Sequence, residues 1–349
     1  MIKKIVFGMA LLALVSSCNS SAKKNSTDQK SNPMNAAVHF VHDSENKKVA
    51  VYFGDQLFTN YLYVEDYYKP VLHPLITKSG QSLTRGYPIE PQPIERVDHP
   101  HHVGYWLNYG DVNGYDFWNH SDAIPADKKE GYGTVFPVSF EVDEAKGKLS
   151  IVTEWKAPDG TVLIEEHTDF VFSEKDNHRF IDRTSTLHAK EEVSLTDNKE
   201  GFLGIRVSRA LEHPSTKPEI FTDANGIPSE VKVLNNEGVT GQYLSSEGIK
   251  GDDVWGTRGK WVALNGIQNG EAVAITIYDH PENLGYPTYW HARGYGLFAA
   301  NPLGQKIFSE GALELNASIP KGEKLTFKFR VMISDGAAVD VALANQNGY

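Results

Sequence analysis

Four histidines gather in the stretch VDHPHHVGYWLNYGDVNGYDFWNH, which runs from Val97 to His120. The same stretch holds three aspartates, two tryptophans and three tyrosines, with almost no aliphatic residues. Imidazoles and carboxylates are side chains that exchange protons or bind metal ions. A core strand would alternate Val, Ile and Leu, and a flexible loop would contain few large aromatics. The composition therefore predicts a functional site.

A second stretch of the same character, YDHPENLGYPTYWHARGYGLFAANPLG, runs from Tyr278 to Gly304. Each stretch adjoins a predicted strand end, so we expect the two to converge on one pocket. Sugars bind with their C–H faces on aromatic rings and their hydroxyls on polar side chains. The sequence therefore predicts a saccharide site. The side chains expected to contact the sugar are Trp106, Asn113, Asp116, Trp118, Arg206 and Asn301.

Metal binding is a second chemistry that the histidines allow. His99 and His101 form an H-x-H pair, which an extended backbone would direct to one side while His102 points to the other. Imidazoles at this spacing suit Zn, Cu, Ni or Fe. We expect no cofactor, and a divalent transition metal at this pair stays open as an alternative. A third ligand would have to come from a distant histidine, namely His120, His167 or His280.

Other familiar chemistries lack their motifs. The segment Asp111–Asp116 does not have the spacing of a calcium-binding EF-hand loop, and its Asn113-Gly114 pair is typical of a turn. The sequence contains no G-x-S-x-G motif and no glycine-rich phosphate loop after a strand. A glycosidase using two carboxylates stays open because of Glu165, Glu166 and Asp169. Adjacent strand residues face opposite ways, so Glu165 and Glu166 cannot form that pair together.

The N-terminus resembles a bacterial lipoprotein signal peptide. Lys3 and Lys4 precede the apolar run 5–15, and Val-Ser-Ser leads to Cys18, the only cysteine in the chain. We expect residues 1–17 to be removed, Cys18 to be lipidated and residues 18–35 to form a flexible tether. This places the protein in the cell envelope, anchored to a membrane through its lipid only. The net charge of -11 argues against nucleic acid as a partner.

The rest of the chain has the two-residue periodicity of strands. Segments such as GKLSIVTEW, EAVAITIYD and KLTFKFRVMIS alternate or are rich in β-branched and aromatic residues, and Gly, Asn, Asp or Pro separates them. We predict an all-β fold, a large antiparallel β-sandwich that forms a single domain over residues 36–349. The proline-rich stretch 72–137 is expected to be irregular. A short C-terminal helix in GAAVDVALANQ is expected, with Asp335 as its cap.

Three motifs together resemble a known family. DHPHHVGYW…GDVNGYDFW, VWGTRGKWV and DHPENLGYPTYWHARGYGLFAANPLG are similar to the bacterial PmoA-like family, also labelled "methane oxygenase". The resemblance covers nearly all of the chain after the signal peptide. It implies a β-sandwich envelope protein of carbohydrate-degrading bacteria, with activity on uronic-acid-bearing oligosaccharides. Methane chemistry does not follow, because particulate methane oxygenases are embedded in membranes and this sequence has no spanning segment after the signal peptide.

The reaction implied by the resemblance is loss of water from the non-reducing-end uronic acid of an oligosaccharide. Such a lyase must neutralise the carboxylate, remove the C5 proton and protonate the departing 4-hydroxyl. Arg293 or Arg206 can hold the carboxylate, and His102 or His291 can act as base. Tyr289 or a second histidine can act as acid. On an extended segment His291 and Arg293 share a face.

Two other functions remain open at this stage. One is a non-catalytic glycan-binding lipoprotein, which would need an aromatic platform without a convergent set of His, Arg and Tyr. The other is a metal-dependent oxidoreductase or hydrolase, which would need a metal at the H-x-H pair.

Overall fold

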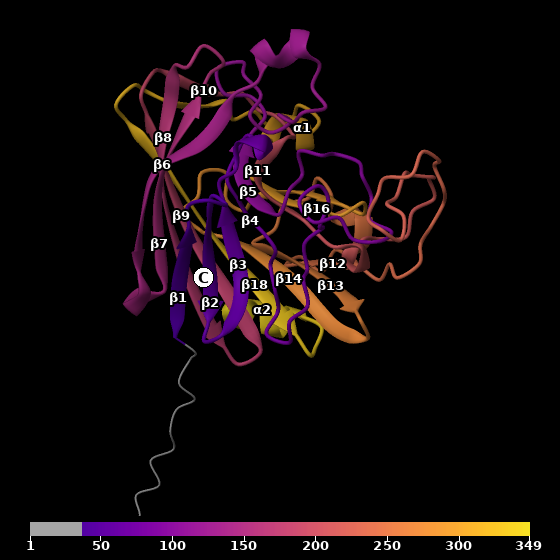
Figure 1. Cartoon of the computed structure of the whole chain (residues 1–349). Coiled ribbons are helices and arrows are strands. Elements are labelled where there is room, and N and C mark those ends of the chain that lie inside the picture. The colour runs from indigo at the N-terminus through magenta and orange to yellow at the C-terminus, as the bar shows by residue number, and fades with distance from the viewer. Residues whose placement is uncertain (1–36) are drawn as a thin grey trace, which may run out of the picture. The chain divides into compact units, whose positions relative to one another are not determined.

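In the computed structural model, residues 37–349 are described, and two eight-stranded antiparallel sheets form a sandwich (Figure 1). The first sheet has the order β1 (Val38–Asp43), β2 (Lys48–Phe53), β3 (Gln56–Leu62), β4 (Val71–Leu72), β5 (Tyr105–Tyr109), β11 (Gly201–Arg206), β16 (Leu297–Asn301) and β15 (Tyr289–Arg293). The second sheet has the order β12 (Gln242–Ser245), β13 (Trp261–Gln268), β14 (Glu271–Asp279), β18 (Lys324–Asp335), β9 (His178–Ala189), β8 (Val162–Lys175), β7 (Lys148–Lys156) and β6 (Thr134–Asp143).

The remaining elements are short. A small sheet pairs β10 (Val193–Leu195) with β17 (Ala317–Ile319). The α-helices are α1 (Gln305–Phe308) and α2 (Val341–Asn347), and the 3₁₀ turns are η1 (Glu65–Tyr67), η2 (Ala126–Gly131), η3 (Glu144–Lys146), η4 (Arg209–Leu211) and η5 (Gly251–Val254). No helix in residues 37–349 is both long enough and apolar enough to cross a membrane.

Alternation along the strands places the main core between the two sheets. In β7, for example, Leu149, Ile151, Thr153 and Trp155 are buried while the residues that alternate with them are partly exposed. On the first sheet, Tyr105, Leu107 and Phe298 belong to this main core. The opposite face of the first sheet carries a second hydrophobic cluster, which includes Trp106 of β5 and Leu297 and Ala299 of β16.

The predicted β-sandwich is confirmed, and two of its local details need correction. The stretch 72–137, expected to be irregular, contains β5 and the start of β6. β5 pairs with β11 from Gly201 to Ile205, so a distant strand stabilises this short aromatic strand within the proline-rich stretch. The C-terminal helix is also present, but its cap is Asp340, whose side chain accepts from the backbone N–H of Leu343. Asp335, the predicted cap, ends β18 instead.

Candidate functional site

The outer face of the first sheet forms the floor of the candidate site. β15 pairs with β16 so that His291 lies opposite Ala299 and Arg293 opposite Leu297. Trp290 and Ala292 point into the main core, so His291 and Arg293 share the outer face, as their spacing predicted. Arg206 of β11 borders the same face, and its guanidinium lies over the Tyr295 ring at 5.2 Å.

A stack of aromatic rings joins the two motif stretches. The His99 ring lies parallel to that of Tyr295, with centroids 4.8 Å apart, and parallel to that of His102 at the same distance. The His102 ring in turn lies 5.5 Å from Trp106 of β5. The expectation that His102 points away from His99 is therefore wrong. His99 has a left-handed backbone (φ 47°), so the segment is not extended and the alternation of a strand does not apply.

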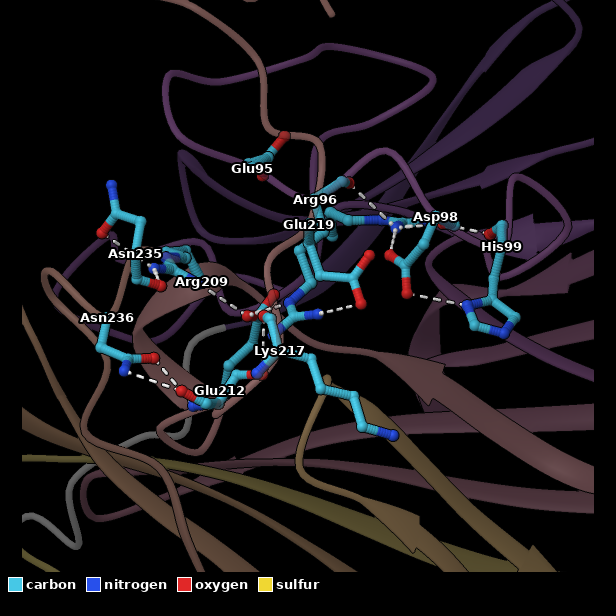
Figure 2. Close-up of polar contacts among 12 residues, drawn as sticks. Glu95, Arg96, Asp98, His99, Arg209, Glu212, Lys217, Glu219, Asn235 and Asn236 are labelled. Atoms are coloured by element: carbon cyan, nitrogen blue, oxygen red, sulfur yellow. Dashed lines mark hydrogen bonds and ion pairs between the residues drawn. The ribbon is translucent and has the colours of Figure 1, made fainter. Parts of the chain in front are cut away.

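Asp98 holds this histidine segment in place. Its carboxylate accepts hydrogen bonds from Arg206 Nη2 at 2.7 Å and Arg85 Nη1 at 3.2 Å. It also accepts from His99 Nδ1 at 2.8 Å (Figure 2). Burial opposes ionisation of this carboxyl, but the charge of Arg206, assisted by His99 and Arg85, outweighs burial and lowers the pKa of Asp98. The guanidinium of Arg206 is fully buried, and its Nε and Nη1 have no partner in the described part of the chain.

His291 is held in one tautomer. Its Nδ1 donates to the carbonyl oxygen of Lys199 at 2.9 Å, because a carbonyl only accepts, and Nε2 therefore carries the lone pair. Burial, with the nearby charges of Arg293 and Lys199, lowers the pKa of His291 to about 3. The ring is thus neutral and able to accept a proton at ordinary pH.

His102 is even more enclosed. The side chain is buried, and neither ring nitrogen has a hydrogen-bond partner within residues 37–349. Burial, together with the charges of His101 and Arg206, lowers its pKa well below the usual value. An unpartnered buried nitrogen is unfavourable unless another polar group reaches it. The ring is therefore suited to contact a polar ligand.

Lys69 is a site residue that sequence analysis missed. Its ammonium donates to the carbonyl oxygen of His101 at 2.7 Å and lies 5.5 Å from the centroid of Trp106. The side chain is only 1% exposed, and burial lowers the pKa of Lys69 to about 7. A lysine that titrates near neutral pH can donate or accept a proton. Its sequence context, YYKP, offers no signal for this, because the burial depends on distant segments.

Three other residues that were predicted to contact the sugar lie in or beside the site. Trp118 packs against Trp106 with ring centroids 4.8 Å apart, so it belongs to the site's wall. Asp116 accepts from the backbone N–H groups of Trp118 and Asn119, and thereby shapes that wall. The amide of Asn301 donates to the carbonyl oxygens of Asn198 and Lys199, which fixes the loop beside His291.

Asn113 lies apart from this cluster. It occupies a turn with Gly114, as predicted, and both have positive φ. Its amide donates to the carbonyl oxygen of Glu192 and its oxygen accepts from the N–H of Ser194, so the side chain attaches the turn to β10.

Arg293 and Tyr289 are stacked on aromatic rings. The Arg293 guanidinium lies 4.4 Å from the centroid of Trp255 and makes no ion pair in the described residues. The Tyr289 ring lies 5.5 Å from that of Phe308. Both side chains come from β15, on the face that carries His291.

Within residues 37–349 no third ligand completes a metal site at His99 and His101. Their ring centroids are 5.7 Å apart, and residues 37–349 contain no group of three or more His, Cys, Asp or Glu side chains arranged to hold a metal ion. His120 bonds the carbonyl oxygen of Gly133, His167 pairs with Glu165, and His280 lies against Tyr349. The metal alternative stays a prediction.

The carboxylates of β8 lie in the second sheet. Glu166 is buried in the core, where it accepts from Trp155 Nε1, Thr168 Oγ1 and Arg183 Nη2. Asp169 pairs with Lys148 on the neighbouring strand. These contacts assign them to the stability of the sheet and not to a glycosidase pair.

A family model described as "Family of unknown function (DUF6807)" matches residues 48–347. The PmoA-like name suggested by the motifs is not part of that description and stays a prediction. No curated protein matches the sequence.

Several solved structures are similar at low identity. The GH36 alpha-galactosidase AgaB from Geobacillus stearothermophilus is 11% identical, with a TM-score of 0.40 over 86% of this chain and 41% of that one. A galactose mutarotase-like protein from Clostridium acetobutylicum is 11% identical, with a TM-score of 0.33 over 86% and 99%. A GalM/aldose epimerase homologue from C. elegans is 11% identical, with a TM-score of 0.30 over 87% and 100%. The chain spans about two fifths of the alpha-galactosidase's length.

Proposed function

The chain belongs to the DUF6807 family of unknown function, and we propose that it is a carbohydrate-active lyase. The proposed reaction is the elimination of water from the non-reducing-end uronic acid of an oligosaccharide, which gives an unsaturated uronyl unit. The observation that carries this proposal is the neutral His291, with its lone pair on Nε2, on one face with the unpaired guanidinium of Arg293.

His291 is the proposed base. Its Nε2 removes the C5 proton, the electrons of that C–H bond form the C4–C5 double bond, and the C4–O bond breaks. The leaving hydroxyl takes a proton from an acid in the pocket and departs as water. A neutral imidazole in a buried site can take a proton without first losing one.

Arg293 is the proposed clamp for the carboxylate. A guanidinium can donate two parallel hydrogen bonds to a carboxylate, and its fixed positive charge acidifies the C5 proton. Stacking on Trp255 holds the group in one plane. Arg206 is less available for this role, because Asp98 already occupies its Nη2.

The proposed acid is Tyr289 or Lys69. Tyr289, which the sequence named as a possible acid, lies on the face of His291. Burial lowers the pKa of Lys69 to about 7, so its ammonium can release a proton near neutral pH. His102, with two unpartnered nitrogens against Trp106, is proposed to bind a sugar hydroxyl.

The experiment that tests this proposal follows ultraviolet absorbance while the protein acts on oligosaccharides with a saturated uronate end. The new double bond is conjugated to the carboxylate, so absorbance must rise. His291→Ala is expected to lower the rate by ~10²–10⁴, as for the loss of a general base. Arg293→Lys is also expected to be strongly impaired, because an ammonium cannot form the bidentate clamp. An unchanged rate in both variants would reject this assignment.

The proposed location of the protein in the cell envelope rests on the sequence alone. We propose that Cys18 is lipidated and anchors the protein in the cell envelope; this residue lies outside the residues that the structure describes.

Non-catalytic glycan binding remains the alternative function. The stacked rings of His99, His102 and Trp106 suit it, and binding without any rise in absorbance would favour it.

A further inference from the structure

A cleft of about 540 Å³ adjoins the candidate site. Its walls include the segment 213–219, Trp255 and the turn from Ala292 to Tyr295 that joins β15 to β16. Tyr295 and Arg293 belong to both regions, because the Tyr295 ring also stacks on His99 and Arg293 shares the face of His291. A saccharide whose terminal unit lies at His291 would therefore place its next unit in this cleft.

The cleft is lined by more cationic than acidic side chains: Arg96, Lys217 and Arg293 against Glu219 and Asp252. Both acidic side chains have a partner in the same wall: Glu219 lies 3.8 Å from Arg96 Nη1, and Asp252 accepts a hydrogen bond from His213 Nδ1 at 2.8 Å. Lys217, by contrast, has no side-chain hydrogen bond or ion pair in the described residues, and Figure 2 shows its ammonium end without a dashed contact. Unpaired cations favour an anionic ligand.

His213 adds a second observation that indicates a ligand. Its side chain is only 8% exposed, and its Nε2 is buried without a partner in the part of the chain that the structure describes. Because Nδ1 donates to Asp252, Nε2 of the neutral ring is an acceptor, able to take a hydrogen bond from a sugar hydroxyl. A buried acceptor beside a free ammonium matches a sugar that carries both hydroxyls and an acid group.

We propose that this cleft is a second subsite, which binds a carboxylate-bearing sugar unit next to the reacting uronate. Lys217 binds the carboxylate and His213 accepts from a hydroxyl of that second unit. The substrate class is thereby narrowed to acidic oligosaccharides with at least two adjacent acidic units. This inference rests on the proposed function for the placement of the terminal unit at His291.

The test measures binding by calorimetry with matched disaccharides. Each pair consists of a diuronate and the same disaccharide with only its second unit reduced to the neutral sugar, prepared for galacturonate, glucuronate and mannuronate. For at least one pair, wild-type protein is expected to bind the diuronate about two- to fivefold more tightly, the range for one exposed charge contact. Lys217→Met is expected to lose this preference.

Lys232→Met is the matched control. Lys232 is an exposed lysine of the same long loop that does not line the cleft, so its variant should keep the preference. The proposal is overturned if no pair shows a preference, or if the preference survives in Lys217→Met. Because binding and elimination are measured separately, a charge preference without elimination would reject only the proposed reaction. Elimination without a charge preference would reject only the second subsite.

Discussion

At the residue scale, the site contains both charged ion pairs and neutral histidines. Asp98 pairs with Arg206 and Arg85, whereas burial keeps the imidazoles of His102 and His291 neutral. Removal of a proton from carbon needs an unprotonated base, and a nearby positive charge stabilises the negative charge that develops; His291 beside Arg293 provides both. Burial lowers the pKa of Lys69 to about 7, which brings this ammonium into the range where it exchanges protons near neutral pH.

The pH dependence of kcat/KM follows from these pKa values. With His291 as base and Lys69 as acid, kcat/KM should be high between about pH 3 and 7 and fall as Lys69 loses its proton above pH 7. Lys69→Arg should move that upper limb to higher pH, because a guanidinium stays charged. A pH–rate profile of both proteins measures this, and an identical upper limb in the variant would assign the acid to Tyr289.

Asp98 is expected to stabilise the fold in a pH-dependent way. Its folded pKa is lowered, so its contribution is fully present above the unfolded pKa of about 4 and is lost as pH falls toward the folded value. Asp98→Asn should lower the free energy of unfolding by about 2–3 kcal/mol at pH 7 and by less at pH 3. Urea unfolding at both pH values measures it.

The control for this prediction is Asp253→Asn. The Asp253 side chain is exposed and makes no hydrogen bond or ion pair within residues 37–349. Its variant should unfold like the wild type at both pH values. If Asp98→Asn lowers the free energy of unfolding equally at pH 7 and pH 3, the proposed stabilisation by ion pairs of Asp98 with Arg206 and Arg85 is contradicted.

At the scale of the elements, β5, β11, β15 and β16 form the floor, and the loop from Asp98 forms the wall. Close packing of Trp106 and Trp118 on this floor depends on Gly204 of β11. A Cβ at this position would lie 2.7 Å from Trp106 and 2.9 Å from Trp118. The absence of a side chain at Gly204 thus allows both tryptophans to lie on the sheet.

Gly204→Ala should displace the tryptophan pair. Overpacking of this kind costs about 1–3 kcal/mol of stability, and the moved rings should weaken saccharide binding. Gly131→Ala is the control, since a Cβ there meets no atom within 4 Å. Thermal unfolding and calorimetric titration with a diuronate measure the two effects. If Gly204→Ala binds the diuronate as tightly as the wild type does, the tryptophan pair does not form the wall that contacts the sugar.

The elements also show what sequence alone can predict. The shared face of His291 and Arg293 was predictable, because the alternation of a strand is local. The direction of His102 was not, because His99 takes a left-handed backbone in a segment that Asp98 ties to Arg206, 108 residues away. The burial of Lys69 likewise depends on contacts to His101 and Trp106 from other segments. Tertiary contacts therefore determine the parts that the sequence did not predict.

At the scale of the whole molecule, the two sheets of the sandwich can be followed in Figure 1, and the site lies on the outer face of the first sheet.

The proposed lipid anchor lies outside the part of the chain that the structure describes. Cys18→Ser should release the protein into the soluble envelope fraction without changing its unfolding temperature. Fractionation followed by immunoblotting measures this, and a variant that remains with the membrane would contradict lipidation at Cys18.

The central claim is elimination of water without cleavage of the chain. It is tested most directly by mass spectrometry of the products formed from a uronate-ended oligosaccharide in oxygen-18-labelled water. The account predicts a product of unchanged chain length that is lighter by one water and carries no label. Shorter saccharides that contain oxygen-18 would instead identify a hydrolase and contradict the account.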